Sequence, residues 1–252
     1  MMHDFYFNNL WLSRFGGRLL GHPKHEIAKR EVDAVSIPGL SGDLLLDNKR
    51  YLNVEFERSL AFMPFLATQT AKKLAYNIIE WLTSAPGEYS IFKDTYNPGY
   101  FTKAYISDFS ELERELPYLL SAKVKFNRIP FWYSDVGTRK IELLNGTAVI
   151  NNPETLESEP VITYICESNK YSPVININGE SITLNKPDGY TKVVVDRQKL
   201  QYIAYSSDTS GLHLPVHVSE ELIPFLVPGK NVIEVSGFHE GSLTLTPNWR
   251  RL

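Results

Sequence analysis

Hydrophobic and polar residues follow a helical period in one stretch of the chain, residues 70–83. Five apolar residues fall at i, i+3, i+4, i+7 and i+11 and share one face, namely Ala71, Leu74, Ala75, Ile78 and Leu82. The polar residues between them, such as Lys72 and Glu80, point away from that face. Because Pro86 and Gly87 stop the pattern, we predict a helix at about 70–84, roughly 20 Å long.

The rest of the first half has the patterns of strands. Residues 51–58 alternate apolar and polar side chains, which is typical of a half-buried strand. The turn-forming residues Asn97, Pro98 and Gly99 join two extended segments as a hairpin. A lone helix cannot build a bundle and must pack on strands. We therefore predict a mainly β fold in which the strands of the N-terminal half are arranged around one α-helix.

A second hairpin, at about 30–47, has an unusual pattern. Its arms, 30–37 and 43–47, are joined by the glycine- and proline-containing segment 38–42. Neither arm alternates cleanly, so apolar side chains occupy both faces, and these are Val32, Val35, Ile37, Leu44, Leu45 and Leu46. A hairpin that projects from a monomer would expose them to water. We therefore predict that a partner covers this hairpin, and a neighbouring copy of the chain is the first candidate.

The second half reads as short strands separated by turn signals. Residues 151–160 are polar and acidic and contain two prolines, so we place a domain junction there and expect domains at 1–149 and 150–252. Beyond it, Asn178 and Gly179 lie between two short β-like segments and favour a type I′ hairpin turn. Many short strands with no helical pattern predict a second β-sandwich.

Composition narrows the possible partners and compartments. The formal net charge is −3, from 26 basic and 29 acidic residues, which gives no general electrostatic reason to bind nucleic acid or an anionic membrane. Cys166 is the single cysteine and lies in an apolar run, so we interpret it as a buried core residue and not as a nucleophile. No stretch has the length and apolar character of a membrane span, and we expect no signal peptide at the N-terminus.

The sequence offers no convincing catalytic, cofactor or metal site. His22 and His25 flank a turn, while His213 and His217 would lie roughly 13 Å apart on a strand, too far to share an ion. The spacing of residues 110–113 resembles a capping box and predicts one helical turn. Glu111, Glu113 and Glu115 would then form its solvated face. We find no phosphate-binding loop and no serine triad, and we predict a protein that is not an enzyme and uses no cofactor.

Aromatic residues leave a second function open. Tyr202, Tyr205 and Trp249 could stack on a sugar or on a partner protein, but core and edge packing within a β-sandwich is the favoured explanation, because Tyr and Trp are normal strand residues. A carbohydrate-binding β-sandwich that adheres to a host surface is therefore the alternative to an assembly protein. An unrecognised glycan hydrolase is a further alternative, for which no acid pair stands out.

Motifs along nearly the whole chain resemble one known family. They are FYFNN at 5–9, SIPGLSGDLLLD at 36–47, RYLNVE at 50–55, IEWL at 79–82, DTYNPGYFTKAY at 94–105, KFNRIPFWY at 125–133, VPGKNVI at 227–233 and TPNWRR at 246–251. Their order and spacing are similar to those of the distal tail proteins of siphoviruses and prophages that infect Gram-positive bacteria. The chain lacks the large insertions that some members carry as carbohydrate-binding modules, so the resemblance points to the short, structural form.

The resemblance implies a homohexameric ring at the end of the tail tube. The N-terminal domain would be a β-sandwich with one α-helix and a projecting hairpin. It would close the ring, with the hairpin at 30–47 as a belt between subunits. The C-terminal galectin-like sandwich would be a platform for baseplate or receptor-binding proteins. The implied partners are other copies of the chain, including a stacked ring, the tail tube protein and a tail-associated or tail fibre protein. DNA would pass through without specific binding, and the protein would be made in the bacterial cytoplasm, would not insert into a membrane and would reside at the virion tail tip.

Overall fold

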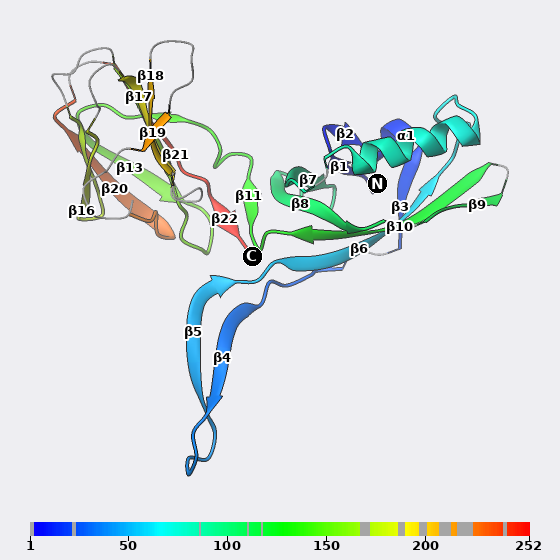
Figure 1. Ribbon diagram of the computed structural model, residues 1–252. Helices are drawn as coiled ribbons and strands as arrows, with labels where there is room; N and C mark the ends of the chain where they lie inside the picture. Colours follow the sequence, from blue (N-terminus) through cyan, green and yellow to red (C-terminus); the bar gives the residue numbers. More distant parts are fainter. Residues whose placement is uncertain are drawn as a thin grey trace. The chain divides into compact units, whose positions relative to one another are not determined.

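The computed structural model describes residues 3–21, 24–85, 87–109, 111–116, 118–166, 172–185, 190–196, 201–206, 213–215, 224–238 and 241–252, with only the backbone described at 190, 201–206 and 213–215. Most of the regular secondary structure in these residues is β-strand. The described residues contain one α-helix, α1 (Ala71–Thr83) (Figure 1). The prediction of a mainly β fold is confirmed. The chain divides into two compact units, unit 1 (residues 1–132, with Leu252) and unit 2 (residues 133–251).

Unit 1 is built on one continuous sheet in the order β2-β1-β7-β8-β10-β6-β3, with β9 paired to β10. The strands are β1 (Phe5–Phe7), β2 (Leu10–Trp11), β3 (Gly17–Leu20), β6 (Val54–Phe62), β7 (Ser90–Asp94), β8 (Tyr100–Asp108), β9 (Leu112–Leu116) and β10 (Leu119–Arg128). The short 3-10 helix η1 (Leu12–Phe15) connects β2 to β3. The central pair, β6 and β10, is antiparallel over its full length, from Leu120 opposite Phe62 to Arg128 opposite Val54.

The predicted helix packs on one face of this sheet. Thr70 caps its N-terminus, where the hydroxyl oxygen accepts a hydrogen bond from the backbone N–H of Lys73. Its buried face consists of Leu74, Ile78, Trp81 and Leu82, close to the face expected from the periodicity. These side chains join phenylalanines from β1, β6, β7 and β10 in one core. The Trp81 indole N–H also donates to the carbonyl of Phe7 at 2.7 Å, which fixes the helix against β1.

The predicted hairpin forms a sheet of its own, β4 (Arg30–Ser36) and β5 (Asp43–Tyr51). In Figure 1 it extends away from the rest of unit 1, and α1 lies on the other side of the unit 1 sheet. Within the described part of the chain, neither strand pairs with any other strand. The hairpin therefore contributes almost nothing to the core of its own unit.

Unit 2 is a β-sandwich. One sheet has the order β12-β21-β14-β17-β18-β19 and the other β13-β20-β15-β16. Both contribute side chains to a single core, including Ile162 and Tyr164 from the first and Ile175 and Ile233 from the second. The strands are β12 (Ile141–Glu142), β13 (Gly146–Asn152), β14 (Val161–Ile165), β15 (Val174–Ile177), β16 (Glu180–Thr183), β17 (Tyr190–Asp196), β18 (Gln201–Ser206), β19 (His213–Pro215), β20 (Gly229–Ser236) and β21 (Ser242–Thr246).

The type I′ turn expected between β15 and β16 is present. Asn178 and Gly179 have φ values of 55° and 99°, and Ile177 pairs with Glu180 across them. The amide of Asn178 also reaches β20, where its nitrogen donates to Asn231 at 2.8 Å. The turn therefore holds the edge of this sheet in register.

The domain junction does not lie where the sequence indicates. Along the chain, the boundary between the units falls inside β11 (Trp132–Ser134), with which β22 (Arg250–Arg251) pairs. The predicted boundary at 149/150 falls within β13, which pairs with β20 along its whole length. The acidic segment 151–160 is a connection inside unit 2, where Asn152 and Ser158 are buried and hydrogen-bonded. Its polarity reflects these internal bonds and not a linker between domains.

Candidate assembly surface

The strand register of the hairpin sorts its side chains into two faces. Opposite residues in an antiparallel pair point to the same side. Asp33 pairs with Leu46 and Val35 with Leu44, and we call this set face A. The other side, face B, contains the pairs Val32 with Asp47, Ala34 with Leu45 and Ser36 with Asp43. The predicted two-sided apolar character is therefore real, but face A is the more continuous apolar surface.

All six predicted hairpin residues are exposed. The exposed fractions are 45% for Val32, 43% for Val35, 39% for Ile37, 47% for Leu44, 67% for Leu45 and 47% for Leu46. Single exposed apolar residues are ordinary, but a cluster on a projecting ribbon is typical of an interaction site. The structure thus brings together the residues that the sequence singled out, on an element that its own unit leaves uncovered.

Charges on the hairpin are separated by position. Residues 31–48 include four acidic residues, Glu31, Asp33, Asp43 and Asp47, and no lysine or arginine. The basic residues Arg30 and Arg50 lie at the base, where Arg30 pairs with Asp47 at 2.7 Å and Arg50 pairs with Glu31. These pairs are solvent-exposed and lower the pKa of both carboxyls through their hydrogen bonds, but exposed pairs add little stability. The projecting part is consequently an apolar ribbon with acidic character.

Irregular backbone shapes the base of the hairpin. The pairing register shifts between Arg30 and Val32, which indicates a β-bulge, and Lys49 on the opposite strand has φ 55°. The Asp47 carboxylate accepts a hydrogen bond from the backbone N–H of Lys49 at 2.9 Å and so supports this turn of the backbone. Bulges bend and twist a strand pair. The base is therefore built to set the direction in which the ribbon leaves unit 1.

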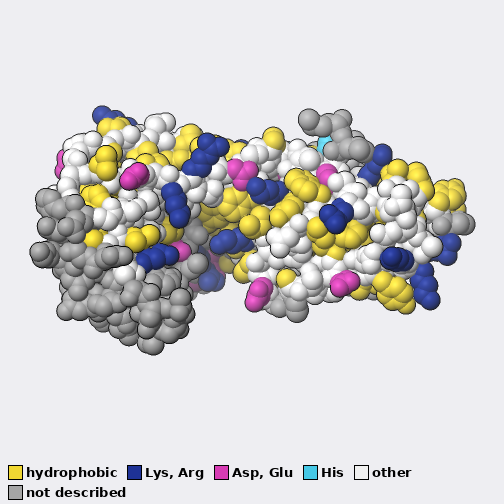
Figure 2. Space-filling model, turned by 90° about the horizontal axis from the view of Figure 1, so that it is seen from above, with side chains coloured by type: hydrophobic (Ala, Val, Ile, Leu, Met, Phe, Trp, Pro, Cys, Tyr) yellow, Lys and Arg dark blue, Asp and Glu magenta, His cyan; other side chains and the backbone are white. Residues whose placement is uncertain are grey.

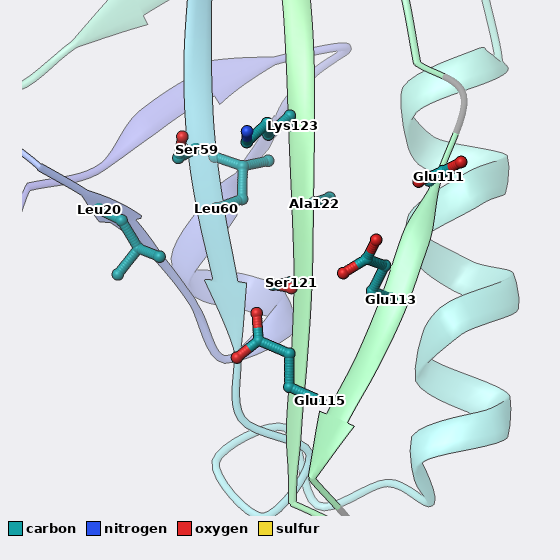
Figure 3. Close-up of a pocket in the computed structure, with 9 residues that line it drawn as sticks. All are labelled: Leu20, Ser59, Leu60, Glu111, Glu113, Glu115, Ser121, Ala122 and Lys123. Atoms are coloured by element: carbon teal, nitrogen blue, oxygen red, sulfur yellow. The ribbon is translucent and has the colours of Figure 1, made fainter.

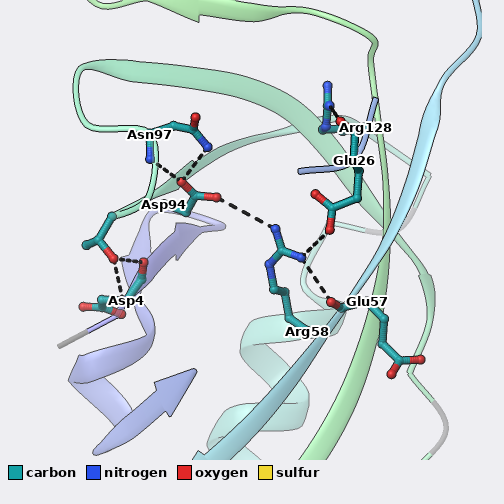
Figure 4. A network of polar contacts seen from close by, with 8 residues as sticks. Asp4, Glu26, Glu57, Arg58, Asp94, Asn97 and Arg128 are labelled. Carbon is teal, nitrogen blue, oxygen red and sulfur yellow. Dashed lines mark hydrogen bonds and ion pairs between the residues drawn. The ribbon is translucent and has the colours of Figure 1, made fainter. Parts of the chain in front are cut away.

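A buried polar network fixes the segment that leads into the hairpin (Figure 4). The Arg58 guanidinium, on β6, donates to the Glu26 carboxylate at 2.8 Å and lies over the Phe56 ring at 4.5 Å. Arg128, on β10, donates to the backbone carbonyl of Glu26 at 3.0 Å. Both arginines are buried, so residue 26 is held from two neighbouring strands. This anchor lies four residues before β4 begins.

The same network reaches β7 through Asp94. Its carboxylate accepts two hydrogen bonds from Asn97 and lies 4.0 Å from the Arg58 guanidinium. One Asp94 oxygen and the Arg58 Nε nitrogen are buried without a hydrogen-bond partner. Burial lowers the pKa of Arg128 to about 10, which still leaves its guanidinium charged at neutral pH. Two buried cations are thus balanced by Glu26 and Asp94.

Sequence reasoning missed these two arginines, although the pattern contains a signal for them. On β6, Arg58 occupies a buried position between Phe56 and Leu60. On β10, the alternate buried positions Val124 and Phe126 are followed by Arg128. A charged residue in a row of buried positions requires a partner. The partner Glu26 could not be found in this way, because it lies on an irregular segment.

The acidic residues near position 113 lie on a strand, and the predicted helical turn is wrong. Residues 112–116 form β9, which pairs with β10 and thereby overrides the local capping-box spacing. Alternate positions on a strand share a face, so Glu111, Glu113 and Glu115 line one hollow of about 420 Å³ together with Lys123 (Figure 3). In the part of the chain that the structure describes, no group of three or more His, Cys, Asp or Glu residues could hold a metal ion.

One of the three proposed sugar-stacking residues is buried. Trp249 is 4% exposed and belongs to the core of unit 2, where its backbone and side chain pack against Gly137, so the prediction is wrong for this residue. The backbones of Tyr202 and Tyr205 lie in β18, and their side chains fall outside the described residues. His22 and His217 are also outside them. Cys166 is buried, as predicted.

Comparison with known proteins identifies the fold. No protein-family model matches the chain, and no curated protein does either. Among solved structures, the crystal structure of the SPP1 Dit protein, described as a paradigm of the hub adsorption apparatus in phages infecting Gram-positive bacteria, matches with a TM-score of 0.64 and 10% identity. The match covers 97% of this chain and 98% of that chain. The chain has the fold of the SPP1 Dit protein.

Baseplate structures of phage P2 agree with this assignment. In the activated conformation with Ca, a chain of the baseplate matches with a TM-score of 0.55 and 10% identity, covering 100% of this chain and 99% of that one. The corresponding structure with Sr gives the same TM-score and covers 98% of its chain. The resemblance to distal tail proteins is thereby confirmed at the level of the Dit fold. None of the helices in the described ranges is long and apolar enough to span a membrane.

Proposed function

We propose that this chain is a structural component of a phage tail, a distal tail protein that forms a homohexameric ring at the end of the tail tube. The observation that carries the proposal is the hairpin, which leaves its own unit and exposes six large apolar side chains. The match to the SPP1 Dit fold over nearly the whole of both chains supports the proposal. Because an open ribbon and its acceptor are different surfaces, copies would join head to tail, and such an interface yields a ring when the rotation between copies closes.

In the proposed ring each unit has a separate task. Unit 1 closes the ring through the hairpin, and unit 2 serves as the platform for baseplate or receptor-binding proteins. One side of the ring meets the tail tube protein and the other a tail-associated or tail fibre protein. The net charge of −3 suits a channel that lets DNA pass without binding, since phosphate binding requires a basic surface. The protein would be synthesised in the host cytoplasm and reside at the virion tail tip, without catalysis or a cofactor.

The mass of the purified protein tests the proposal directly. Native mass spectrometry and sedimentation should give six times, or twelve times for stacked rings, the chain mass of 28.8 kDa. Negative-stain images should show rings with sixfold symmetry. A protein that stays at 28.8 kDa at high concentration would contradict the ring.

Replacing Leu45 with aspartate should weaken assembly more than folding. Leu45 is 67% exposed, so the folded monomer tolerates a carboxylate there, whereas an interface that covers this position must bury it. We expect the concentration at half-assembly to rise at least about tenfold, as sedimentation can measure.

The matched control is Leu144→Asp in unit 2, which is 68% exposed and lies outside the hairpin. It should assemble like the unmodified protein. Equal behaviour of the two variants would refute the assignment of the hairpin to the interface.

A carbohydrate-binding sandwich is the competing proposal. Burial of Trp249 removes one of the three residues on which it rested, and a sugar-binding monomer has no use for the projecting ribbon. Glycan binding by the monomeric protein, abolished by Tyr202→Ala or Tyr205→Ala, would favour it.

A further inference from the structure

The chemistry of the hairpin restricts the surface that can receive it. Face A presents Val35, Leu44 and Leu46 together with the carboxylate of Asp33, and no lysine or arginine occurs between residues 31 and 48. An acceptor must therefore be apolar and basic, because opposite charges are what make two surfaces complementary. This inference rests on the proposed function, in which the occupant is a second copy of the chain.

The outward face of α1 has this composition. At 100° per residue, the side of the helix away from its buried residues carries Lys72, Lys73, Tyr76, Ile79 and Glu80. Tyr76 is 64% exposed and Ile79 is 41% exposed, and both lysines are exposed. Figure 2 views the molecule from the side where α1 lies in Figure 1, and Lys or Arg side chains, hydrophobic side chains and some Asp or Glu side chains are interspersed there over the region of unit 1. The exposed Tyr76 and Ile79 therefore form an apolar stripe that is basic over the first turn of the helix, where Lys72 and Lys73 lie, and acidic at Glu80.

Electrostatics also distinguishes the two ends of this helix. Lys72 and Lys73 lie in its first turn, where the helix dipole adds further positive potential, and the acidic Glu80 lies towards the other end. An acidic ribbon would therefore place Asp33 near the first turn of α1. The hollow beside β9 is a poor acceptor for the same reason, because Glu111, Glu113 and Glu115 would repel it.

The dimensions of the two elements are compatible. A 13-residue helix is about 20 Å long, and a seven-residue strand such as β4 is about 23 Å long. We propose that face A of one copy's hairpin packs along the outward face of α1 of the next copy, with Asp33 beside Lys72 and Lys73. Each copy then supplies one ribbon and one helix, which is the arrangement that a head-to-tail ring requires.

Disulfide trapping tests the contact itself. Cys166 is buried, so cysteines introduced at the surface react without competition from it. We would combine Tyr76→Cys or Ile79→Cys with Leu44→Cys or Leu46→Cys in one chain and oxidise the assembled protein. At least one pair should give a ladder of covalent oligomers on a non-reducing gel. Leu45→Cys, on face B, is the matched control and should give no ladder with the same helix positions.

A charge exchange tests the energetics. Lys72→Glu with Lys73→Glu should raise the concentration at half-assembly at least tenfold, and addition of Asp33→Lys to the same chain should recover most of the loss. The control, Arg139→Glu with Lys140→Glu, makes the same change of charge at exposed positions of unit 2 and should have no effect.

The outcomes separate this inference from the proposed function. In one outcome, the protein with Lys72→Glu and Lys73→Glu still assembles and the cysteine pairs give no ladder, but Leu45→Asp prevents assembly. This result would rule out α1 as the acceptor and would leave the hairpin assigned to the interface. If the protein assembles normally both with Lys72→Glu and Lys73→Glu and with Leu45→Asp, the assignment of the hairpin to the interface is also wrong. Loss of assembly with Lys72→Glu and Lys73→Glu, and its recovery on addition of Asp33→Lys, would support both the hairpin as the interface and α1 as its acceptor.

Discussion

Shortening the hairpin so that Asn-Gly joins Val32 directly to Asp47 should convert the assembling protein into a folded monomer. These two residues are cross-strand partners, so a two-residue type I′ turn can close the ribbon at that point. The bulge and the pair between Arg30 and Asp47 remain. The strand pairs of the removed residues, 33–46, are only with one another, and these residues contribute no buried side chain to unit 1. The deletion also removes the exposed hydrogen bond from Asn48 to Asp33, so the unfolding free energy should change by less than about 1 kcal/mol.

Sedimentation velocity measures whether the shortened protein is a monomer, and denaturant unfolding measures its unfolding free energy. The control shortens only the tip, with Asn-Gly between the partners Ser36 and Asp43, which removes Ile37 but keeps the strands β4 and β5. It should still form rings, because face A keeps Val35, Leu44 and Leu46. Rings formed equally well by the longer deletion would show that the ribbon is dispensable and that the proposed belt is wrong.

The parts of the fold that the sequence predicted are those specified by local patterns. The helical period of 70–83 acts within the segment itself, and the structure reproduces it. The turn at Asn178 and Gly179 is also local, since it depends on two residues that tolerate positive φ. The hairpin was found because its apolar residues did not fit a single covered face, and the structure leaves them exposed.

The errors arose where a partner distant in sequence decides the structure. The capping-box spacing at 110–113 favours a helical turn, but pairing of β9 with β10 outweighs it. The acidic segment 151–160 reads as a linker, yet Ser158 pairs with Leu226 through backbone hydrogen bonds in both directions. Trp249 reads as a surface aromatic only until β22 brings the chain back to β11, where the carbonyl of Trp249 accepts from the N–H of Ser134 at 2.9 Å.

The candidate site likewise has one part that the sequence predicts and another that it does not. Its apolar residues could be read from the sequence, because exposure of a two-sided ribbon follows from its pattern. Its base could not, since Glu26 is held by arginines 32 and 102 residues away in the chain. The orientation of the ribbon is therefore a tertiary property, set by buried charges that no local pattern combines.

Replacing Arg58 with methionine should lower the unfolding free energy of unit 1 by about 3 kcal/mol, because Asp94 then keeps a buried charge without its cation. The Asp94 side chain is 1% exposed, and that of Glu26 is 21% exposed, so most of the loss should come from Asp94. Methionine preserves much of the packing on Phe56. The experiment belongs in the protein shortened at Val32 and Asp47, because ring formation would otherwise add to the apparent stability.

Hydrogen exchange of unit 1 peptides under increasing denaturant measures this loss separately from unit 2. The double variant Arg58→Met with Asp94→Asn should recover a large part of it, since the amide oxygen can still accept from Asn97 while the unpaired charge is gone. Exchange at the amide of Leu52, which donates to the carbonyl of Lys29 at 2.8 Å, should accelerate as Glu26 is released. A variant as stable as its parent, with Leu52 equally protected, would show that the buried network neither stabilises unit 1 nor fixes the base of the ribbon.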